Sequence, residues 1–201
     1  MIKNILFDCA GVLTQMNFRG LMLDISGSEE LADSLVANLW QPGSPWLLYD
    51  KGELNSRQIV GELKKFLPVG LHPYLQTLID RLLEAFPPME GMEALVDQLH
   101  QKGYSCYLLS NFPDRFAGLP AITPILQKLD GMVISYQIHM LKPDPAIFLR
   151  AAQILGIEPN ETIFIDDNAP NVLSEKTVGM AGHHFTSVED LKAHFLQAGI
   201  L

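Results

Sequence analysis

Four segments of the sequence place polar side chains where an apolar run ends, and together these side chains could do chemistry. The first is Asp8, which follows the apolar run Ile5-Leu6-Phe7 and precedes a turn at Gly11. In open α/β sheets a ligand lies beyond the carboxyl ends of the strands, so an acid at that point is placed to meet a substrate. The other three segments hold Ser110 and Asn111, Lys142, and the pair Asp166 and Asp167.

The paired acids carry the strongest of these signals. Asp166 and Asp167 would end a buried strand, where two carboxylates repel each other unless a cation or a proton lies between them. Lys142 can supply a point charge to an anion, although most lysines are ordinary surface residues. Ser110 and Asn111 could equally be turn formers. Taken together, the four segments favour an anionic substrate held beside a cation.

Composition limits what the chain can be. It has 201 residues, of which 48% are hydrophobic and 18% are charged, with a formal net charge of −9. Nucleic acids and anionic membranes attract clustered Lys and Arg, so we expect no nucleic-acid and no membrane partner. Cys9 and Cys106 lie in or beside predicted strands, which indicates reduced thiols. With no membrane-spanning run and no signal peptide before Met1, we expect a cytoplasmic protein that is a monomer or weak dimer.

Strands and helices that alternate along the chain would position the four segments. This pattern predicts an α/β fold with a doubly wound parallel sheet and helices on both faces. Asp144 and Pro145 mark one helix start, as N-cap and first helical residue. The first expected strand ends at Asp8, and the other four span residues 104–109, 131–135, 162–165 and 180–185. The expected core helices span residues 91–102, 145–155, 169–178 and 187–196.

A long helical stretch separates the first strand from the rest of this pattern. Apolar residues recur at helical spacing over residues 28–40, 56–67 and 73–86. Structureless connections of such length are uncommon, and a helical insertion just after the candidate acid is typical of a lid over an active site. We therefore predict a core domain of residues 1–14 and 88–201, and a cap domain of residues 15–87.

The order of the polar segments resembles the four motifs of the haloacid dehalogenase-like (HAD) superfamily. Its elements here are Asp8, Ser110, Lys142 and the pair Asp166-Asp167. The more specific runs are Lys142-Pro143-Asp144-Pro145-Ala146-Ile147-Phe148 and Phe164-Ile165-Asp166-Asp167-Asn168. The resemblance covers nearly the whole chain and implies a Rossmann-like core with an inserted helical cap. It is nearest to the small phosphatases related to bacterial α-D-glucose 1-phosphate phosphatase.

The resemblance also implies an activity and roles for individual residues. The protein would be an Mg²⁺-dependent phosphatase that acts on a small phosphorylated metabolite, with Asp8 as the nucleophile that forms an aspartyl-phosphate. The phosphoryl oxygens would be held by Ser110, Asn111 and Lys142. The Mg²⁺ ligands would be Asp8, the backbone carbonyl of Ala10, and one or both of Asp166 and Asp167.

Ala10 departs from the pattern of the superfamily. Most phosphatases of this kind have a second Asp two residues after the nucleophile, which protonates the leaving group and then activates water. A general acid or base contributes roughly 10²–10⁴ in rate. Its absence would confine the enzyme to easy leaving groups, move the role to another group, or mark a different reaction.

Three branches of the superfamily share this gap. Phosphonoacetaldehyde hydrolases have Ala there and a Schiff-base lysine in the cap, for which Lys51 is the best placed. The 2-haloacid dehalogenases work without metal and lack the paired acids, whereas the small phosphatases have Gly. We favour a phosphatase first and an enzyme that cleaves the C–P bond of phosphonoacetaldehyde second. The alternative to an enzyme is a phosphate-binding regulatory protein with little turnover. Lys51 and Glu53 lie in a polar turn of the cap and are expected to set specificity.

Overall fold

A parallel sheet forms the centre of the core in the computed structural model, which covers residues 1–201. The sheet has five strands in the order β3-β2-β1-β4-β5, and every neighbouring pair is parallel. The strands are β1 Asn4–Phe7, β2 Ser105–Ser110, β3 Gly131–Ile134, β4 Thr162–Asp166 and β5 Ala181–His184. All of β1 is buried, as its apolar run predicts. The order places the carboxyl ends of β2, β1 and β4 side by side.

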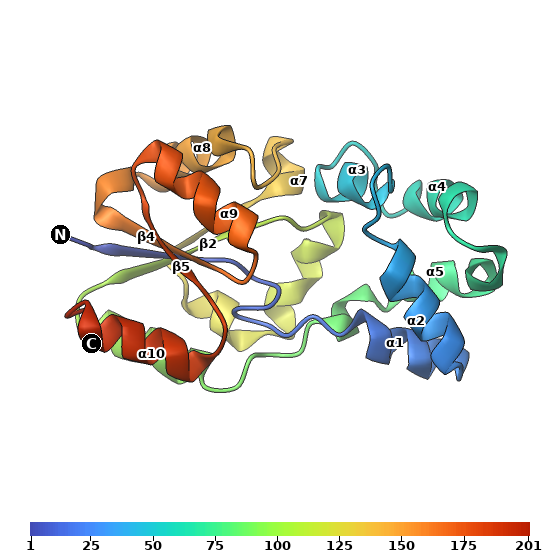
Figure 1. Ribbon diagram of the computed structural model, residues 1–201, viewed down its shortest axis with the longest axis horizontal. Coiled ribbons are helices and arrows are strands. Elements are labelled where there is room, and N and C mark those ends of the chain that lie inside the picture. Colours follow the sequence, from blue (N-terminus) through green and yellow to red (C-terminus); the bar gives the residue numbers. More distant parts are fainter.

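Helices cover both faces of this sheet (Figure 1). Neighbouring residues of β1 point to opposite faces, so Ile5 and Phe7 belong to one hydrophobic cluster and Leu6 to another. On the first face lie α6 Met92–Gln101 and α10 Val188–Gln197; on the second lie α8 Pro145–Leu155 and α9 Ala169–Ser174. This arrangement confirms the prediction of a doubly wound α/β fold.

Helix α8 begins and ends where its sequence signals predict. The carboxylate of Asp144 accepts a hydrogen bond from the backbone N–H of Ala146 at 2.9 Å, and Pro145 occupies the first helical position. Gly156 ends the helix in the left-handed region at a φ of 67°. The loop that carries Lys142 therefore enters a well-defined helix start.

The remaining core elements are short. They are α7 Ser135–Ile138 and the 3₁₀ segments η3 Asp114–Ala121, η4 Pro124–Lys128, η5 Pro159–Glu161 and η6 Glu175–Val178. The prediction of one helix over residues 169–178 was wrong in its second half, where the chain becomes η6. The hydroxyl of Thr177 donates to the carbonyl of Ser174 at 2.7 Å and tightens the turn before Gly179 ends it.

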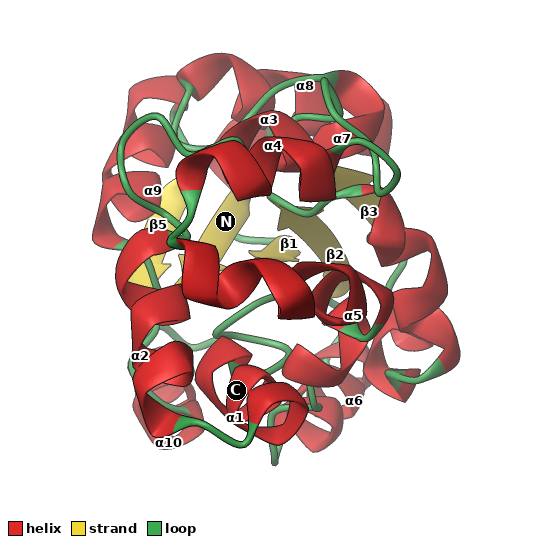
Figure 2. Ribbon diagram, turned by 90° about the vertical axis from the view of Figure 1, so that its right-hand side faces the viewer, coloured by secondary structure: helices red, strands yellow, loops and turns green.

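The helices between β1 and α6 lie beyond the carboxyl ends of the strands (Figure 1). Figure 2 looks onto them from that side, with the sheet behind. They are α1 Phe18–Ser26, α2 Glu29–Asn38, α3 Trp46–Asp50, α4 Ile59–Phe66 and α5 Leu75–Asp80, with 3₁₀ segments η1 Val69–Tyr74 and η2 Leu82–Ala85. We call residues 15–87 the cap. No helix of the protein combines the length and apolar character needed to cross a bilayer.

Two features of the cap differ from the prediction. The helix expected over residues 73–86 is wrong as one element, because the chain leaves helical geometry at Arg81, whose φ is −98° and ψ is 11°. There the guanidinium of Arg81 binds Glu84 and reaches Asp24 of α1 at 2.8 Å. Helix α1 was not predicted; it begins at Asn17, whose side-chain oxygen accepts from the N–H of Gly20 at 2.9 Å.

Aromatic side chains join the cap to the core. Phe18 of α1 lies edge-on to Trp46 of α3 at 5.4 Å between ring centroids, and to Phe86 at 5.6 Å. Phe86 in turn contacts Phe112, just after β2, at 4.6 Å. The first hydrophobic cluster holds 43 buried residues and includes side chains from both parts. The two parts therefore share one continuous packing layer beside the strand ends.

Candidate active site

The sheet order brings three of the predicted site residues to one edge. Asp8 directly follows β1, Ser110 is the last residue of β2, and Asp166 is the last residue of β4. Phe7 is in register with Leu108 on one side and with Ile165 on the other. The three strands therefore end at the same level, and their polar residues face a common space.

Lys142 links two of the acids. Its ammonium nitrogen lies 2.8 Å from Oδ1 of Asp8 and 2.7 Å from Oδ2 of Asp166, and its side chain is 1% exposed. Burial alone would lower the pKa of Lys142, but the two carboxylates outweigh it and raise the pKa above its ordinary value. The ammonium is therefore a fixed positive charge at the strand ends.

Negative charge around Asp8 exceeds positive charge in spite of this lysine. Burial raises the pKa of the Asp8 carboxyl to about 7, against the lowering effect of Lys142, and Asp166 and Asp167 add to the rise. Its Oδ1 accepts a hydrogen bond from the N–H of Cys9 at 2.6 Å. One lysine does not balance three acids, and the cluster suits an additional cation.

The paired acids occupy different environments. Asp166 is fully buried and accepts hydrogen bonds from Lys142, from the N–H of Asn168 at 2.7 Å, and from the Asn171 amide at 3.0 and 3.1 Å. Asp167 is exposed to the cavity, and no other residue donates to its carboxylate. Asp8, Asp166 and Asp167 each offer an oxygen, and these oxygens lie within 4.8 Å of one another. The set has the hard oxygen character that Mg²⁺ prefers.

Gly11 is required by both its backbone and its neighbour. Its φ is 85°, in the left-handed region, and a Cβ at this position would lie 2.2 Å from Oδ2 of Asp167. Any larger residue would displace the Asp167 carboxylate. The sequence predicted the turn at Gly11, whereas the close approach of Asp167 follows only from the fold.

The two polar residues after β2 have different roles in the structure. The hydroxyl of Ser110 is buried and has no hydrogen-bond partner in the protein. Such a group is costly unless a ligand satisfies it. The Asn111 amide instead accepts from the N–H of Lys142 and donates to its carbonyl, both at 2.9 Å. Asn111 thus holds the backbone of Lys142, and this contact does not support the predicted use of its side-chain amide on phosphate.

A cavity of about 470 Å³ lies between the strand ends and the cap. Its lining includes Asp8, Ala10, Asn111, Lys142 and Asp167 from the core, and Trp40 from the cap side. Five of the predicted core residues therefore line one space, whereas Ser110 and Asp166 are fully buried at the ends of β2 and β4 and do not line it.

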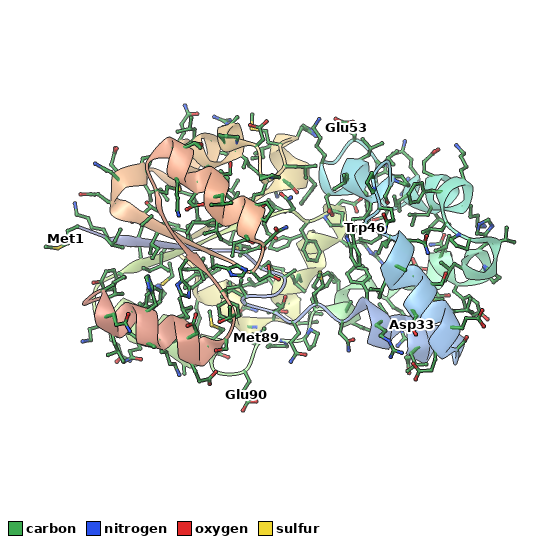
Figure 3. The ribbon with its side chains drawn as sticks, viewed as in Figure 1. Met1, Asp33, Trp46, Glu53, Met89 and Glu90 are labelled. Carbon is green, nitrogen blue, oxygen red and sulfur yellow. The ribbon has the colours of Figure 1, made fainter.

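The two cap residues predicted to set specificity do not line this cavity. The ammonium of Lys51 pairs with the Glu53 carboxylate at 2.6 Å, and their side chains are 38% and 46% exposed. Figure 3 shows Glu53 at the outer edge of the cap, whereas Trp46 lies inside. A role for Lys51 and Glu53 in specificity stays a prediction that these positions do not favour.

Sequence reasoning missed Asn171, which donates to both oxygens of Asp166. Asn171 lies in the first turn of α9, and a polar residue there is ordinarily exposed. Its burial was the missing information, because only 6% of Asn171 is exposed in the fold.

A doubly wound core with an acid cluster, a buried lysine and a helical cap over the strand ends defines a class of α/β hydrolases. Residues 2–179 match the sequence model of the haloacid dehalogenase-like hydrolases, and the chain belongs to this family. The family predicted from the motifs, and with it the prediction of a hydrolase, is confirmed.

Two curated relatives act on phosphate esters according to their names. The chain is 24% identical over 155 residues to the chloroplast flavin mononucleotide hydrolase 1 of Arabidopsis thaliana, covering 77% of this chain and 62% of that protein. It is 28% identical over 177 residues to a plasmid-encoded phosphoglycolate phosphatase of Cupriavidus necator, covering 87% and 74%. The chain thus spans less than two thirds of the first relative.

Two solved structures share the fold. One is a HAD-family enzyme of Bacteroides thetaiotaomicron, solved with magnesium and inorganic phosphate. Its TM-score is 0.70 at 22% identity, and the match covers 97% of this chain and 100% of the enzyme's chain. The L-2-haloacid dehalogenase of Xanthobacter autotrophicus has a TM-score of 0.71 at 18% identity, covering 100% and 85%. These similarities agree with the predicted core and cap architecture. The predicted cellular location and oligomeric state stay predictions.

Proposed function

We propose that the protein is an Mg²⁺-dependent phosphatase that hydrolyses small phosphate monoesters through a phosphoryl group carried on Asp8. The observation that carries this proposal is the uncompensated acid cluster around Asp8, which lies beside a buried lysine and an unpaired serine hydroxyl at adjacent strand ends. Phosphoryl transfer needs positioned charge more than covalent assistance, and this site offers positioned charge of both signs.

Asp8 is arranged to attack with one defined oxygen. Its Oδ1 accepts from the N–H of Cys9 and faces Lys142, which leaves Oδ2 without a donor. We infer that Oδ2 attacks phosphorus while the bond to the leaving group breaks. Water then attacks the same phosphorus, the bond to Asp8 breaks, and inorganic phosphate leaves. The covalent step divides one difficult displacement into two easier ones.

Lys142 and Ser110 would hold the phosphoryl oxygens. An ammonium group has three hydrogens, and Asp8 and Asp166 occupy two of those of Lys142. The third is available for a phosphoryl oxygen. The buried hydroxyl of Ser110 has no other partner and would gain one from the substrate. Asn111 would contribute by fixing the backbone of Lys142.

The donor set fits Mg²⁺, with Asp167 in place of Asp166 as the direct ligand. The oxygens of Asp166 are already occupied by three donors, whereas the Asp167 carboxylate is free. Asp8 and the carbonyl of Ala10, which accepts no hydrogen bond in the protein, would complete the protein ligands. When bound, Mg²⁺ would offset the repulsion between Asp8 and the phosphate dianion.

The relatives support the substrate class, since the names of both refer to hydrolysis of a phosphate ester. The cavity of about 470 Å³ has room for a small metabolite. Cleavage of phosphonoacetaldehyde gains no support, because it needs a cap lysine at the substrate. Lys51 pairs with Glu53 outside the cavity.

The test is turnover of p-nitrophenyl phosphate with Mg²⁺ by wild type, Asp8→Asn and the control Asp33→Asn. Asp33 is an exposed acid of α2 that pairs with Arg19. Asp8→Asn should reduce kcat by about 10³-fold or more, since the nucleophile is lost, whereas Asp33→Asn should match wild type. Activity that survives Asp8→Asn would refute the proposed nucleophile. A wild type that binds phosphate and Mg²⁺ without turnover on a panel of phosphate esters would instead be a regulatory protein.

A further inference from the structure

A buried carboxyl of the cap lies opposite the position where the acid of the core is missing. Ala10 cannot transfer a proton, and the titratable core side chains that line the cavity, Asp8, Lys142 and Asp167, already have roles as nucleophile, phosphate ligand and metal ligand. Asp50, the last residue of α3, is 8% exposed. Its carboxylate forms no ion pair and accepts no hydrogen bond. Sequence reasoning passed over Asp50, because nothing in the polar turn that follows α3 marks it as buried.

Asp50 and Ala10 line the same small hollow of about 70 Å³. Aromatic rings of Trp46, Phe86 and Phe112 form much of its wall, so the surroundings of the carboxyl are mostly apolar. The hollow shares Ala10, Trp40 and Asn111 with the lining of the main cavity, so the two adjoin. A group leaving the phosphate on its cap side would enter this hollow.

The direction of the reaction places the leaving oxygen near Asp50. In phosphoryl transfer the attacking and leaving oxygens lie roughly in line through phosphorus. Asp8 attacks from the strand ends, while Lys142 and Asp167 flank it on the core side. The leaving oxygen must therefore point away from the sheet, toward the cap.

Contacts with the core hold α3 in this position. The hydroxyl of Ser135, at the start of α7, donates to the backbone carbonyl of Asp50 at 2.5 Å and accepts from the N–H of Phe112 at 2.9 Å. The ring Nδ1 of His139 lies 3.0 Å from the carbonyl of Lys51. Gly52 packs so closely on α7 that a Cβ there would lie 2.4 Å from the carbonyl of Tyr136. The backbone that carries Asp50 is therefore fixed against the core.

The surroundings also keep this carboxyl protonated. Burial raises the pKa of Asp50 to about 8, and the negative charge of Asp8 adds to the rise. The nearest charged groups on its own turn, Lys51 and Glu53, neutralise each other at 2.6 Å. Helix α7 contributes no charged side chain within its bounds.

We propose that Asp50 is the general acid and base of the reaction, in the place of the acid absent at position 10; this role rests on the proposed phosphatase function. In the first step the bond from phosphorus to the leaving oxygen breaks, and that oxygen takes the proton of Asp50, so a neutral alcohol departs. In the second step the Asp50 carboxylate removes a proton from the attacking water, the bond to Asp8 breaks, and Asp50 is protonated again.

The experiment compares wild type, Asp50→Asn and the control Glu62→Gln on esters that range from p-nitrophenyl phosphate to alkyl phosphates, all with Mg²⁺. Glu62 is a cap acid outside both cavities and pairs with Lys65. Asp50→Asn should reduce kcat/KM for alkyl phosphates by roughly 10²–10⁴-fold, because these leaving groups need a proton. For the p-nitrophenyl ester kcat/KM should fall less than about tenfold, since its leaving group departs as the anion, whereas kcat should fall for every ester because the base of the second step is lost.

A second variant separates chemistry from folding. Adding Ala10→Asp to Asp50→Asn should restore alkyl phosphate turnover, because it supplies an acid on the same hollow. Equal losses of kcat/KM on all esters, or no loss of kcat/KM on alkyl esters, would overturn the role of Asp50. If wild type hydrolyses none of the esters, the proposed function itself fails and the role of Asp50 fails with it.

Discussion

Replacing Asp50 by Asn should stabilise the folded protein relative to wild type above about pH 4, because the wild-type carboxyl is buried without a partner. Burial and the field of Asp8 raise its pKa from 3.8 to about 8. Between these values the unfolded chain has released this proton while the folded chain retains it, so the wild-type free energy of unfolding falls as pH rises from about 4 to 8. A shift of about 4 pKa units at 1.36 kcal/mol per unit gives ~6 kcal/mol as the upper limit of this loss. Asn does not titrate and avoids the loss.

Urea unfolding of wild type and Asp50→Asn across this pH range measures the effect. Both proteins should be free of Mg²⁺, so that the acids near Asp8 are in the same state in each. We expect similar stability near pH 4, where both side chains are neutral, and a variant that is more stable by several kcal/mol at pH 8 and above. Glu62→Gln, which alters an exposed cap acid, should follow wild type at every pH.

If the free energies of unfolding of wild type and Asp50→Asn differ by a constant amount from pH 5 to pH 8, the reasoning is refuted. It would mean that water or an unrecognised donor reaches the carboxyl and keeps its pKa near the ordinary value. The predicted outcome would instead link the two experiments on Asp50: the variant that loses activity on alkyl phosphates would be the more stable protein, as is common where a functional group is held in an unfavourable environment.

Two further changes test the core of the site. Gly11→Ala should weaken Mg²⁺ binding at least tenfold by isothermal titration calorimetry, because its Cβ would lie 2.2 Å from Oδ2 of Asp167; an unchanged affinity would count against Asp167 as a ligand. Lys142→Met should lower the free energy of unfolding by about 3–5 kcal/mol, because it leaves Asp8 and Asp166 buried without their counter-charge. Added Mg²⁺ should restore part of that loss, and a variant as stable as wild type without metal would contradict the reasoning.

Much of the fold could be predicted from local patterns. The apolar run before Asp8, and the cap and proline at the start of α8, act within a few residues and needed no tertiary information. Parallel strands end at a common edge, so residues that follow separate strands were expected to meet there. Asp8, Lys142 and Asp166 do meet, with nitrogen to oxygen distances of 2.8 and 2.7 Å.

Roles that depend on burial could not be predicted in this way. Asp50 and Lys51 are neighbours in one polar turn, yet the carboxyl of Asp50 faces the aromatic hollow while Lys51 pairs with Glu53 at the surface. The packing of α3 on α7 decides between them, and residues 46–50 and 135–138 are too far apart in the chain for a local pattern to show it. Asn111 is a similar case, because its partner is the backbone of a loop 31 residues away.

The shared aromatic packing has a consequence for how such a cap can evolve or be engineered. The 43 buried residues of the first cluster come from both parts, and Phe18, Trp46 and Phe86 continue into Phe112 of the core. A cap transplanted from a relative would therefore need matching rings on the recipient as well as matching ends of the chain. Exchange of the whole insertion is a core mutation in energetic terms, and so is a change of any of these four rings, all of which also line the hollow around Asp50. Substrate range should accordingly drift through lining side chains that stand outside these ring contacts, such as the exposed Met16, more readily than through replacement of the cap.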